Sequence, residues 1–179
     1  MKIFGLVGWS GSGKTTLVSG LLPELIGRGL TVSTMKHTHH NFDIDKKGKD
    51  SFEHRMAGAT EVLITGSSRW AILHENRDAP EPSIDDLLAR MEDVDLVLIE
   101  GFKSHNHQKM EIYRPAVGKP LLAAEDQSIV AVASDAKAAD LPGLAGRGVP
   151  LISLNDIKAI ADFIIGHTGL ESGVHDGAA

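Results

Sequence analysis

The fold is decided by one stretch of the sequence, Gly8-Trp9-Ser10-Gly11-Ser12-Gly13-Lys14-Thr15, which matches the phosphate-binding pattern G-x-x-x-x-G-K-[ST] at every defined position. The apolar run KIFGLVG at residues 2–8 leads into it, and leucines recur at spacings of three and four over residues 14–28 after it. Glycines let successive backbone N–H groups turn inward around an anion, and the first helical turn adds unpaired N–H groups. The stretch therefore predicts a strand, a phosphate-binding loop and a helix.

The side chains that follow the glycines have expected roles in nucleotide chemistry. We expect Lys14 to place its charge on the β- and γ-phosphates, where it acts as a catalytic group, and the hydroxyl of Thr15 to ligate Mg²⁺. Thr16 is expected to contact the α-phosphate. A second acid should hold the metal through water at the end of another buried strand. Glu100, which ends the apolar run at residues 95–100, is the best candidate.

The rest of the chain continues the alternation of strands and helices. A β-branched run at residues 30–35 predicts a second strand, so the chain begins as a strand–helix–strand unit of a parallel sheet. Further strands are expected at residues 61–65, 70–74, 95–100, 110–113, 129–133 and 150–154, and helices at 51–59, 84–91 and 156–165. Ser83 and Asn155 are the expected caps of the last two helices.

These elements predict an α/β P-loop NTPase fold, with a mostly parallel sheet flanked by helices. Gly66-Ser67-Ser68 separates two short strands and predicts a β-hairpin extension around residues 60–75. We expect one nucleotide-binding domain over residues 1–168 and a flexible C-terminal tail over residues 169–179.

A polar stretch, KHTHHNFDIDKKGKDS at residues 36–51, follows the second strand. In a parallel sheet the residues after each strand lie at the same edge as the phosphate loop, so these side chains are expected near the nucleotide. Asp43 or Asp45 could ligate Mg²⁺ or act as a general base. The groups expected to contact phosphates, a substrate or a partner are Lys36, His37, His39, Lys49, Asp50 and, after the strand at 95–100, Lys103. The histidines at 37, 39 and 40, with His105 and His107, could instead bind a transition metal.

The residues leave the identity of the base open. The guanine signature N-K-x-D is absent, although Ser134-Asp135-Ala136-Lys137 stands where it would fall, directly after the strand at residues 129–133. Asp135 could accept hydrogen bonds from guanine N1 and N2, or it could cap a turn.

Composition excludes several other classes of protein. The 179 residues include 18 Lys and Arg against 24 Asp and Glu, a net charge of −6, which argues against binding long nucleic acid. The sequence contains no cysteine, which excludes disulfides and thiolate metal sites. The apolar runs are far shorter than a bilayer span, and no targeting segment is visible. We therefore expect a cytoplasmic protein with no membrane partner.

The phosphate loop, residues 36–51, RMAGA at residues 55–59 and LIEGFK at residues 98–103 together resemble the MobB family of molybdopterin-guanine dinucleotide biosynthesis adapter proteins. The resemblance extends from residue 1 to about 165. It implies a homodimer that binds GTP and Mg²⁺, hydrolyses GTP slowly, and assists molybdopterin guanylyltransferase and other molybdenum-cofactor enzymes. By the same resemblance, Gly8–Thr16 would bind GTP, Thr15 and Glu100 would serve Mg²⁺, and residues 43–51 would lie at the mouth of the site.

Slow hydrolysis agrees with the residues, since no glutamine stands near the expected strand ends and Arg55 and Arg69 are the only arginine candidates nearby. Two other functions use the same loop. The first is a small-molecule kinase with Asp45 as base and Lys49 as phosphate contact. The second is a metallochaperone GTPase that uses the histidine cluster.

Overall fold

The computed structural model describes residues 1–38, 42–144 and 146–171. Its contacts divide the chain into two compact units, the first made of residues 1–37 and 93–179 and the second of residues 38–92. The sequence predicts one domain over residues 1–168, with the hairpin region as an extension. The predicted tail lies largely outside the described residues, which end at Glu171.

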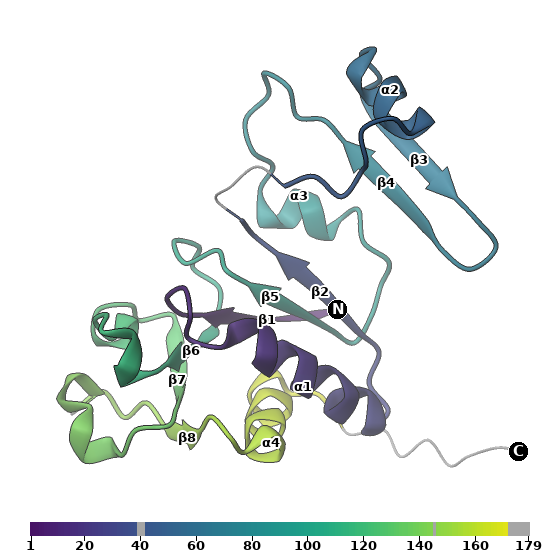
Figure 1. The fold of residues 1–179 in the computed structure, drawn as a ribbon. Helices are drawn as coiled ribbons and strands as arrows, with labels where there is room; N and C mark the ends of the chain where they lie inside the picture. The colour runs from purple at the N-terminus through teal and green to yellow at the C-terminus, as the bar shows by residue number, and fades with distance from the viewer. Residues whose placement is uncertain (39–41, 145, 172–179) are drawn as a thin grey trace, which may run out of the picture. The chain divides into compact units, whose positions relative to one another are not determined.

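The first unit contains a six-stranded sheet in which every pairing is parallel, as the sequence predicted for most of the sheet. The strand order is β2-β5-β1-β6-β7-β8 (Figure 1). The bounds of the strands are Lys2–Val7 (β1), Val32–Lys36 (β2), Leu96–Glu100 (β5), Lys109–Tyr113 (β6), Ile129–Ser134 (β7) and Leu151–Ser153 (β8). Because β1 lies between β5 and β6, the loop that follows β1 emerges at the middle of the carboxyl edge of the sheet.

Two helices, α1 (Lys14–Gly27) and α4 (Ile157–Thr168), lie side by side against one face of this sheet (Figure 1). Leu17, Leu21 and Leu25 recur at a spacing of four in α1 and are almost completely buried. They pack with alternate residues of β1, such as Phe4 and Leu6, and with apolar side chains of α4. The main core of the unit therefore lies directly behind the phosphate loop.

On the opposite face of the sheet, short segments pack against apolar residues of β1 and β7. The 3₁₀ helices are η1 (Pro115–Val117), η2 (Leu122–Ala124), η3 (Ala138–Asp140) and η4 (Pro142–Leu144). Ala123 of η2 packs with Val7, Ile129 and Val132 of the sheet, and Leu144 of η4 joins them. The loops after β6 and β7 are thus anchored to the sheet by apolar contacts.

The second unit contains α2 (Asp50–Met56), the antiparallel hairpin of β3 (Glu61–Thr65) and β4 (Trp70–His74), and α3 (Ile84–Leu88). The hairpin confirms the predicted extension around residues 60–75. Ser83 caps α3 as expected, in a reciprocal capping box with Asp86. The prediction that α3 extends to Met91 was too long.

The cap of α4 differs from the prediction. Asp156, and not Asn155, accepts a hydrogen bond from the backbone N–H of Ala159 at 3.0 Å. Asn155 stands one residue before the cap, and its side chain lines a cavity described below. Among the residues that the structure describes, no helix is both long enough and apolar enough to cross a membrane.

Candidate nucleotide-binding site

The loop between β1 and α1 requires glycine at its first position. Gly8 has φ +153°, and a Cβ there would lie 2.4 Å from the carbonyl oxygen of Ile112 and 2.7 Å from Oγ of Ser12. Any side chain at this position would displace backbone of the neighbouring strand β6. The loop is therefore held tightly against the sheet where it begins.

A cavity of ≈ 370 Å³ opens above the loop. It is lined by Ser10, Gly11, Gly13, Lys14, Thr15, Thr16, Lys36 and Glu100. The structure thus brings together residues from the phosphate motif, the end of β2 and the end of β5. All of these residues were candidates from the sequence, and they meet because β2, β5 and β1 are adjacent parallel strands whose carboxyl ends share one edge.

Lys14 points back into its own loop. Its Nζ donates to the carbonyl oxygens of Gly8 and Trp9, each at 3.0 Å. Burial lowers the pKa of Lys14, an effect that the negative charge of Glu100 opposes and the positive charges of Lys103 and Lys36 reinforce. An anion in this cavity would stabilise the charged form of Lys14, because it would supply an opposite charge where the protein supplies mainly positive ones.

Thr15 and Glu100 form the candidate Mg²⁺ site. The hydroxyl of Thr15 donates to Oε1 of Glu100 at 3.5 Å, and Nζ of Lys36 lies 3.4 Å from the same oxygen. A hydroxyl and a carboxylate oxygen at the rim of a phosphate cavity are the hard oxygen ligands that Mg²⁺ prefers, with the remaining positions left for water and phosphate. The donor set therefore fits the metal. Bound there, Mg²⁺ would neutralise part of the charge on the phosphates.

A lysine lies over the aromatic residue of the loop. Nζ of Lys103 lies 4.0 Å from the centroid of the Trp9 ring, and the Trp9 indole donates to the carbonyl oxygen of Pro120 at 2.8 Å. Burial lowers the pKa of Lys103, and the negative charge of Glu111 opposes this effect. The cation–π contact holds the Lys103 ammonium beside the phosphate loop.

Two buried charged residues of β6 hold the loops around Trp9, and the sequence analysis did not single them out. Nζ of Lys109 donates to the carbonyl oxygen of Lys103 at 3.0 Å and forms an ion pair with Asp126 at 3.4 Å. Glu111 accepts backbone N–H bonds from Leu122 at 2.9 Å and from Ala123 at 2.7 Å, while burial raises its pKa. These contacts fix the position of the loops around Trp9. A polar residue at every second position of a central strand could have signalled them.

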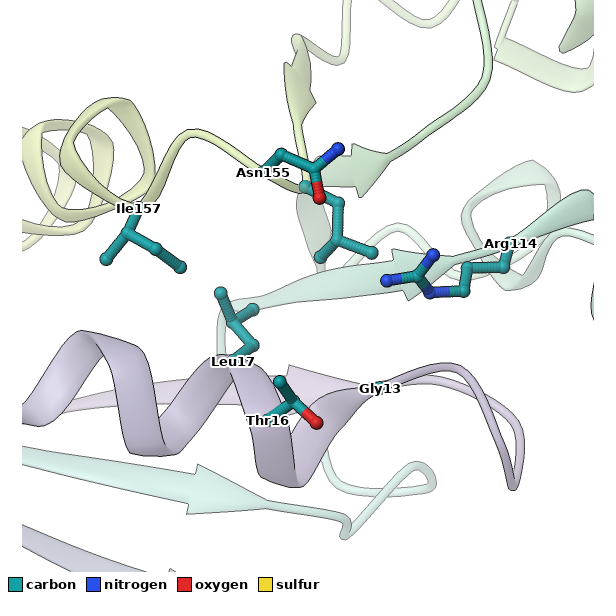
Figure 2. Close-up of a pocket in the computed structure, with 7 residues that line it drawn as sticks. Gly13, Thr16, Leu17, Arg114, Asn155 and Ile157 are labelled. Carbon is teal, nitrogen blue, oxygen red and sulfur yellow. The ribbon is translucent and has the colours of Figure 1, made fainter.

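A second cavity, of ≈ 220 Å³, is shown in Figure 2; it shares Gly13 and Thr16 with the first. Its lining also includes Arg114, which the sequence analysis missed. Nε of Arg114 donates to the carbonyl oxygen of Ser12 at 3.1 Å, and Nη1 donates to Oδ2 of Asp135 at 2.6 Å. The prediction that Arg55 and Arg69 are the only arginine candidates near the site was therefore wrong. Arg114 directly follows β6, so the strand-end reasoning applied to Glu100 could have found it.

His37 lies at the end of β2, where its ring packs on Phe102 with centroids 4.4 Å apart. Gly101 and Phe102 both have positive φ, +101° and +49°, directly after Glu100. A positive φ in a bulky residue is uncommon, and here Phe102 is held between the rings of His37 and His105. This turn directs the chain away from β5 immediately after the candidate metal ligand.

The remaining acidic and basic candidates belong to the second unit. Asp43 and Asp45 form ion pairs with Arg55, at 3.1 and 3.5 Å, and Oγ of Ser51 donates to Asp45 at 2.9 Å. Lys49 is the N-cap residue of α2, and Asp50 begins that helix. Arg55, offered as a candidate for hydrolysis, instead joins the acidic residues of its own unit, and the metal or base role of Asp43 and Asp45 stays a prediction.

The predicted histidine metal site combines His37, His39 and His40 with His105 and His107. His39 and His40 lie outside the described residues, and within those described no group of three or more His, Cys, Asp and Glu side chains is placed to hold a metal ion. Both ring nitrogens of His107 are buried without a hydrogen-bond partner among the described residues, and Nε2 would lie 2.4 Å from a Cβ at Gly5. Burial lowers the pKa of His107 to about 4. His107 therefore packs against β1 as a neutral side chain.

Comparison with known proteins identifies the family. The family model of MobB, "Molybdopterin guanine dinucleotide synthesis protein B", matches residues 3–135.

The chain belongs to the MobB family.

Two relatives of this MobB family member are molybdopterin-guanine dinucleotide biosynthesis adapter proteins. That of Escherichia coli (strain K12) is 38% identical over 168 residues, which is 92% of each chain. That of Haemophilus influenzae is 42% identical over 167 residues, covering 92% of this chain and 88% of the relative. A crystal structure of a molybdopterin-guanine biosynthesis protein B is 26% identical and superposes with a TM-score of 0.71 over 92% of this chain and 99% of that one. The resemblance drawn from the sequence motifs is confirmed.

Proposed function

We propose that the protein is a GTP-binding adapter in molybdopterin-guanine dinucleotide biosynthesis, which holds GTP with Mg²⁺ and hydrolyses it slowly. The observation that carries the proposal is the phosphate cavity, in which the loop amides, Lys14, Thr15 and Glu100 surround one space at the edge of the sheet. The names of the relatives support the adapter role.

The chemistry of the site follows from these groups. The loop amides and Lys14 bind the phosphates, and Thr15 and Glu100 would hold the metal between them. As far as the structure describes the chain, the residues lining the cavity include neither an arginine nor a glutamine. Such groups stabilise the transition state and orient water in fast GTPases, where the arginine contributes roughly 10³–10⁵ in rate. Slow turnover is the consequence.

The test is calorimetric titration of the purified protein with GTP and with ATP in Mg²⁺. We expect GTP to bind at least about tenfold more tightly than ATP, and Lys14→Ala to lose at least about tenfold in affinity for GTP, which corresponds to about 1.4 kcal/mol. Lys2→Ala, a lysine at the other end of β1, is the matched control and should bind like the wild type. Equal binding by Lys14→Ala and the wild type would contradict the proposal. Preference for ATP, with transfer of its γ-phosphate to a metabolite, would favour a kinase.

Hydrolysis is tested separately, by release of inorganic phosphate. Glu100→Gln keeps the size of the side chain but removes its charge, so we expect GTP to bind with weaker Mg²⁺ dependence and phosphate release to fall. Phosphate release by Glu100→Gln at the wild-type rate and the same Mg²⁺ dependence would show that Glu100 does not serve the metal.

The partner is expected to be molybdopterin guanylyltransferase, the enzyme that attaches GMP to molybdopterin. Titration of the purified guanylyltransferase with this protein, with and without GTP, tests that part of the proposal. Absence of binding in both conditions would contradict the adapter role and leave nucleotide binding intact.

We propose further that the protein is a homodimer. Leu63, Ile72 and Trp70 lie on the same face of the β3-β4 hairpin by its register, and all three are exposed. An apolar sheet face of this kind is typical of a protein–protein interface. Light scattering should give the mass of a dimer, and Leu63→Glu should reduce it to that of a monomer. Ile26→Glu, at an exposed isoleucine of α1, is the control and should leave the mass unchanged.

A further inference from the structure

The second cavity of the first unit lies next to the phosphate cavity. The two share Gly13 and Thr16, so a nucleotide whose phosphates lie in one would extend into the other. Thr16 lies in the first turn of α1, where the α-phosphate is expected. The sugar and base of the same nucleotide would then occupy the ≈ 220 Å³ space beyond it.

The lining of this space suits a planar heterocycle. Leu17 of α1, Leu154 from the connection between β8 and α4, and Ile157 at the start of α4 supply apolar surface. Arg114 and Asn155 supply the polar groups, and Figure 2 shows both side chains directed toward the space above Gly13 and Leu17. Apolar walls with a few fixed polar groups are characteristic of small-molecule sites, in which the polar groups decide which ligand is accepted.

Arg114 is held rigidly at this place. Its Nε donates to Ser12 of the phosphate loop, and its Nη1 donates to Asp135 at the end of β7. A Cβ on Gly13 would lie 3.5 Å from Nε and 3.7 Å from Nη2, so the guanidinium group lies next to the last glycine of the loop. Nη2 makes no hydrogen bond to any described residue. A guanidinium carries five N–H donors, and the two bonds observed leave donors for a ligand.

Donors at this position discriminate between the two purines. Guanine presents two acceptors side by side, O6 and N7, whereas adenine presents the acceptor N7 beside an amino group that donates. Arginine has donors only, so it pairs with both acceptors of guanine but opposes the amino group of adenine. The amide of Asn155 can present either a donor or an acceptor by rotation and does not discriminate by itself.

We propose that this cavity is the nucleoside subsite and that Arg114, positioned by Asp135, selects guanine through O6 and N7. The inference rests on the proposed GTP binding and deepens it. It also differs from the hypothesis that Asp135 itself reads guanine N1 and N2. Oδ2 of Asp135 accepts from Arg114 at 2.6 Å, and Asp135 is not part of the cavity lining. Asp135 is therefore a positioning residue.

Guanine analogues separate the two hypotheses on the wild-type protein. We would titrate it calorimetrically with GTP, ATP, 7-deaza-GTP, which lacks the N7 acceptor, and ITP, which lacks the 2-amino group. If Arg114 reads the base, 7-deaza-GTP should bind at least about tenfold more weakly than GTP, and ITP within about threefold of it. The reverse order, with ITP weakened and 7-deaza-GTP unchanged, would overturn the inference in favour of direct reading by Asp135.

The same titration distinguishes a failure of guanine selection by Arg114 from a failure of the proposed GTP binding. Equal affinity for all four nucleotides would refute guanine selection but leave phosphate binding by the loop intact. No binding of any of them would refute the proposed function itself.

A substitution supplies the second test. Glutamine pairs preferentially with N6 and N7 of adenine, so Arg114→Gln should shift the ratio of GTP to ATP affinity toward ATP by at least about tenfold. Arg90→Gln makes the same change of charge at an arginine of the second unit and should leave the ratio unchanged. Circular dichroism and urea unfolding verify that each variant is folded. A ratio unchanged in a folded Arg114→Gln variant would overturn the inference.

Discussion

The buried neutral histidine of the first unit gives a pH dependence of stability that can be calculated. Both ring nitrogens of His107 are inaccessible and unpartnered among the described residues. Burial, with smaller contributions from the charges of Lys109 and His105 and an opposing one from Asp126, lowers the pKa of His107 from 6.5 to about 4. Between these two values the unfolded chain binds a proton at this position and the folded protein does not.

The sign follows from that difference in bound protons. Above pH 6.5 the titration of His107 does not affect the free energy of unfolding. The free energy of unfolding falls as the pH decreases from 6.5 to 4, and below pH 4 the decrease due to His107 is complete. Lowering the pKa of His107 from 6.5 to about 4, at about 1.36 kcal/mol for each pH unit, corresponds to a loss in the free energy of unfolding of about 3.4 kcal/mol at most. Because His107 as a whole is only half-buried and nearby solvent screens its charge, we expect about 2 kcal/mol.

The assay compares the wild type with His107→Leu, which fills similar volume with no titratable group. Urea unfolding at intervals between pH 7.5 and pH 4.5 gives the free energy of unfolding of each protein, and subtraction removes the titration of every group they share. The stability of the variant relative to the wild type should rise by about 2 kcal/mol over this range. A constant difference would refute the reasoning, because it would mean that the folded protein binds the proton at His107 as readily as the unfolded chain.

Three further predictions concern backbone geometry, a helix cap and an ion-pair cluster. Gly8→Ala should abolish nucleotide binding and destabilise the fold, because its Cβ would lie 2.4 Å from the Ile112 carbonyl oxygen. Gly11→Ala, which has open space around it, should lower the free energy of unfolding in urea by only about 1–2 kcal/mol. Asp156→Ala should lower the free energy of unfolding by about 1 kcal/mol through loss of the α4 cap, whereas Asn155→Ala should leave it unchanged, and a larger loss from Asn155→Ala would contradict this assignment. Arg55→Met leaves the carboxylates of Asp43, Asp45 and Glu75 without their cation, so amide hydrogen exchange should become faster in α2 but not in α1. Exchange in α2 at the wild-type rate would show that these ion pairs do not stabilise the helix.

Local pattern was sufficient for most of the secondary structure. The glycines before Lys14 and the leucines after it specify a loop and an amphipathic helix because the signal is contained within about twenty adjacent residues. The hairpin was equally local, since two short strands flank one turn. Element ends were less well determined: α3 stops at Leu88, and the cap of α4 is Asp156, because several neighbouring polar residues can serve as cap and only the backbone geometry selects among them.

The candidate site likewise contains residues that the sequence could place and residues that it could not. Glu100 could be placed from sequence because a strand end in a parallel sheet has only one edge to occupy, and the structure brings it to Thr15. The same rule applied to Asp43 and Asp45 but could not foresee that Arg55, in the following helix, pairs with both within a separate compact unit.

The phosphate-binding motif, the mostly parallel α/β sheet and membership of the MobB family could all be predicted from the sequence alone. Those conclusions depend on short motifs whose chemistry requires particular residues at fixed spacing. The end of β6 places Arg114 at the carboxyl edge of the sheet, but the tertiary structure was needed to show that it contacts the loop, pairs with Asp135 and shares a cavity with Asn155. Arg114 is 102 positions along the chain from Ser12, and Asp135 and Asn155 are farther still, so their meeting depends on the order of β1, β6, β7 and β8 in the sheet. Strand order results from the packing of the whole core, and no local pattern encodes it.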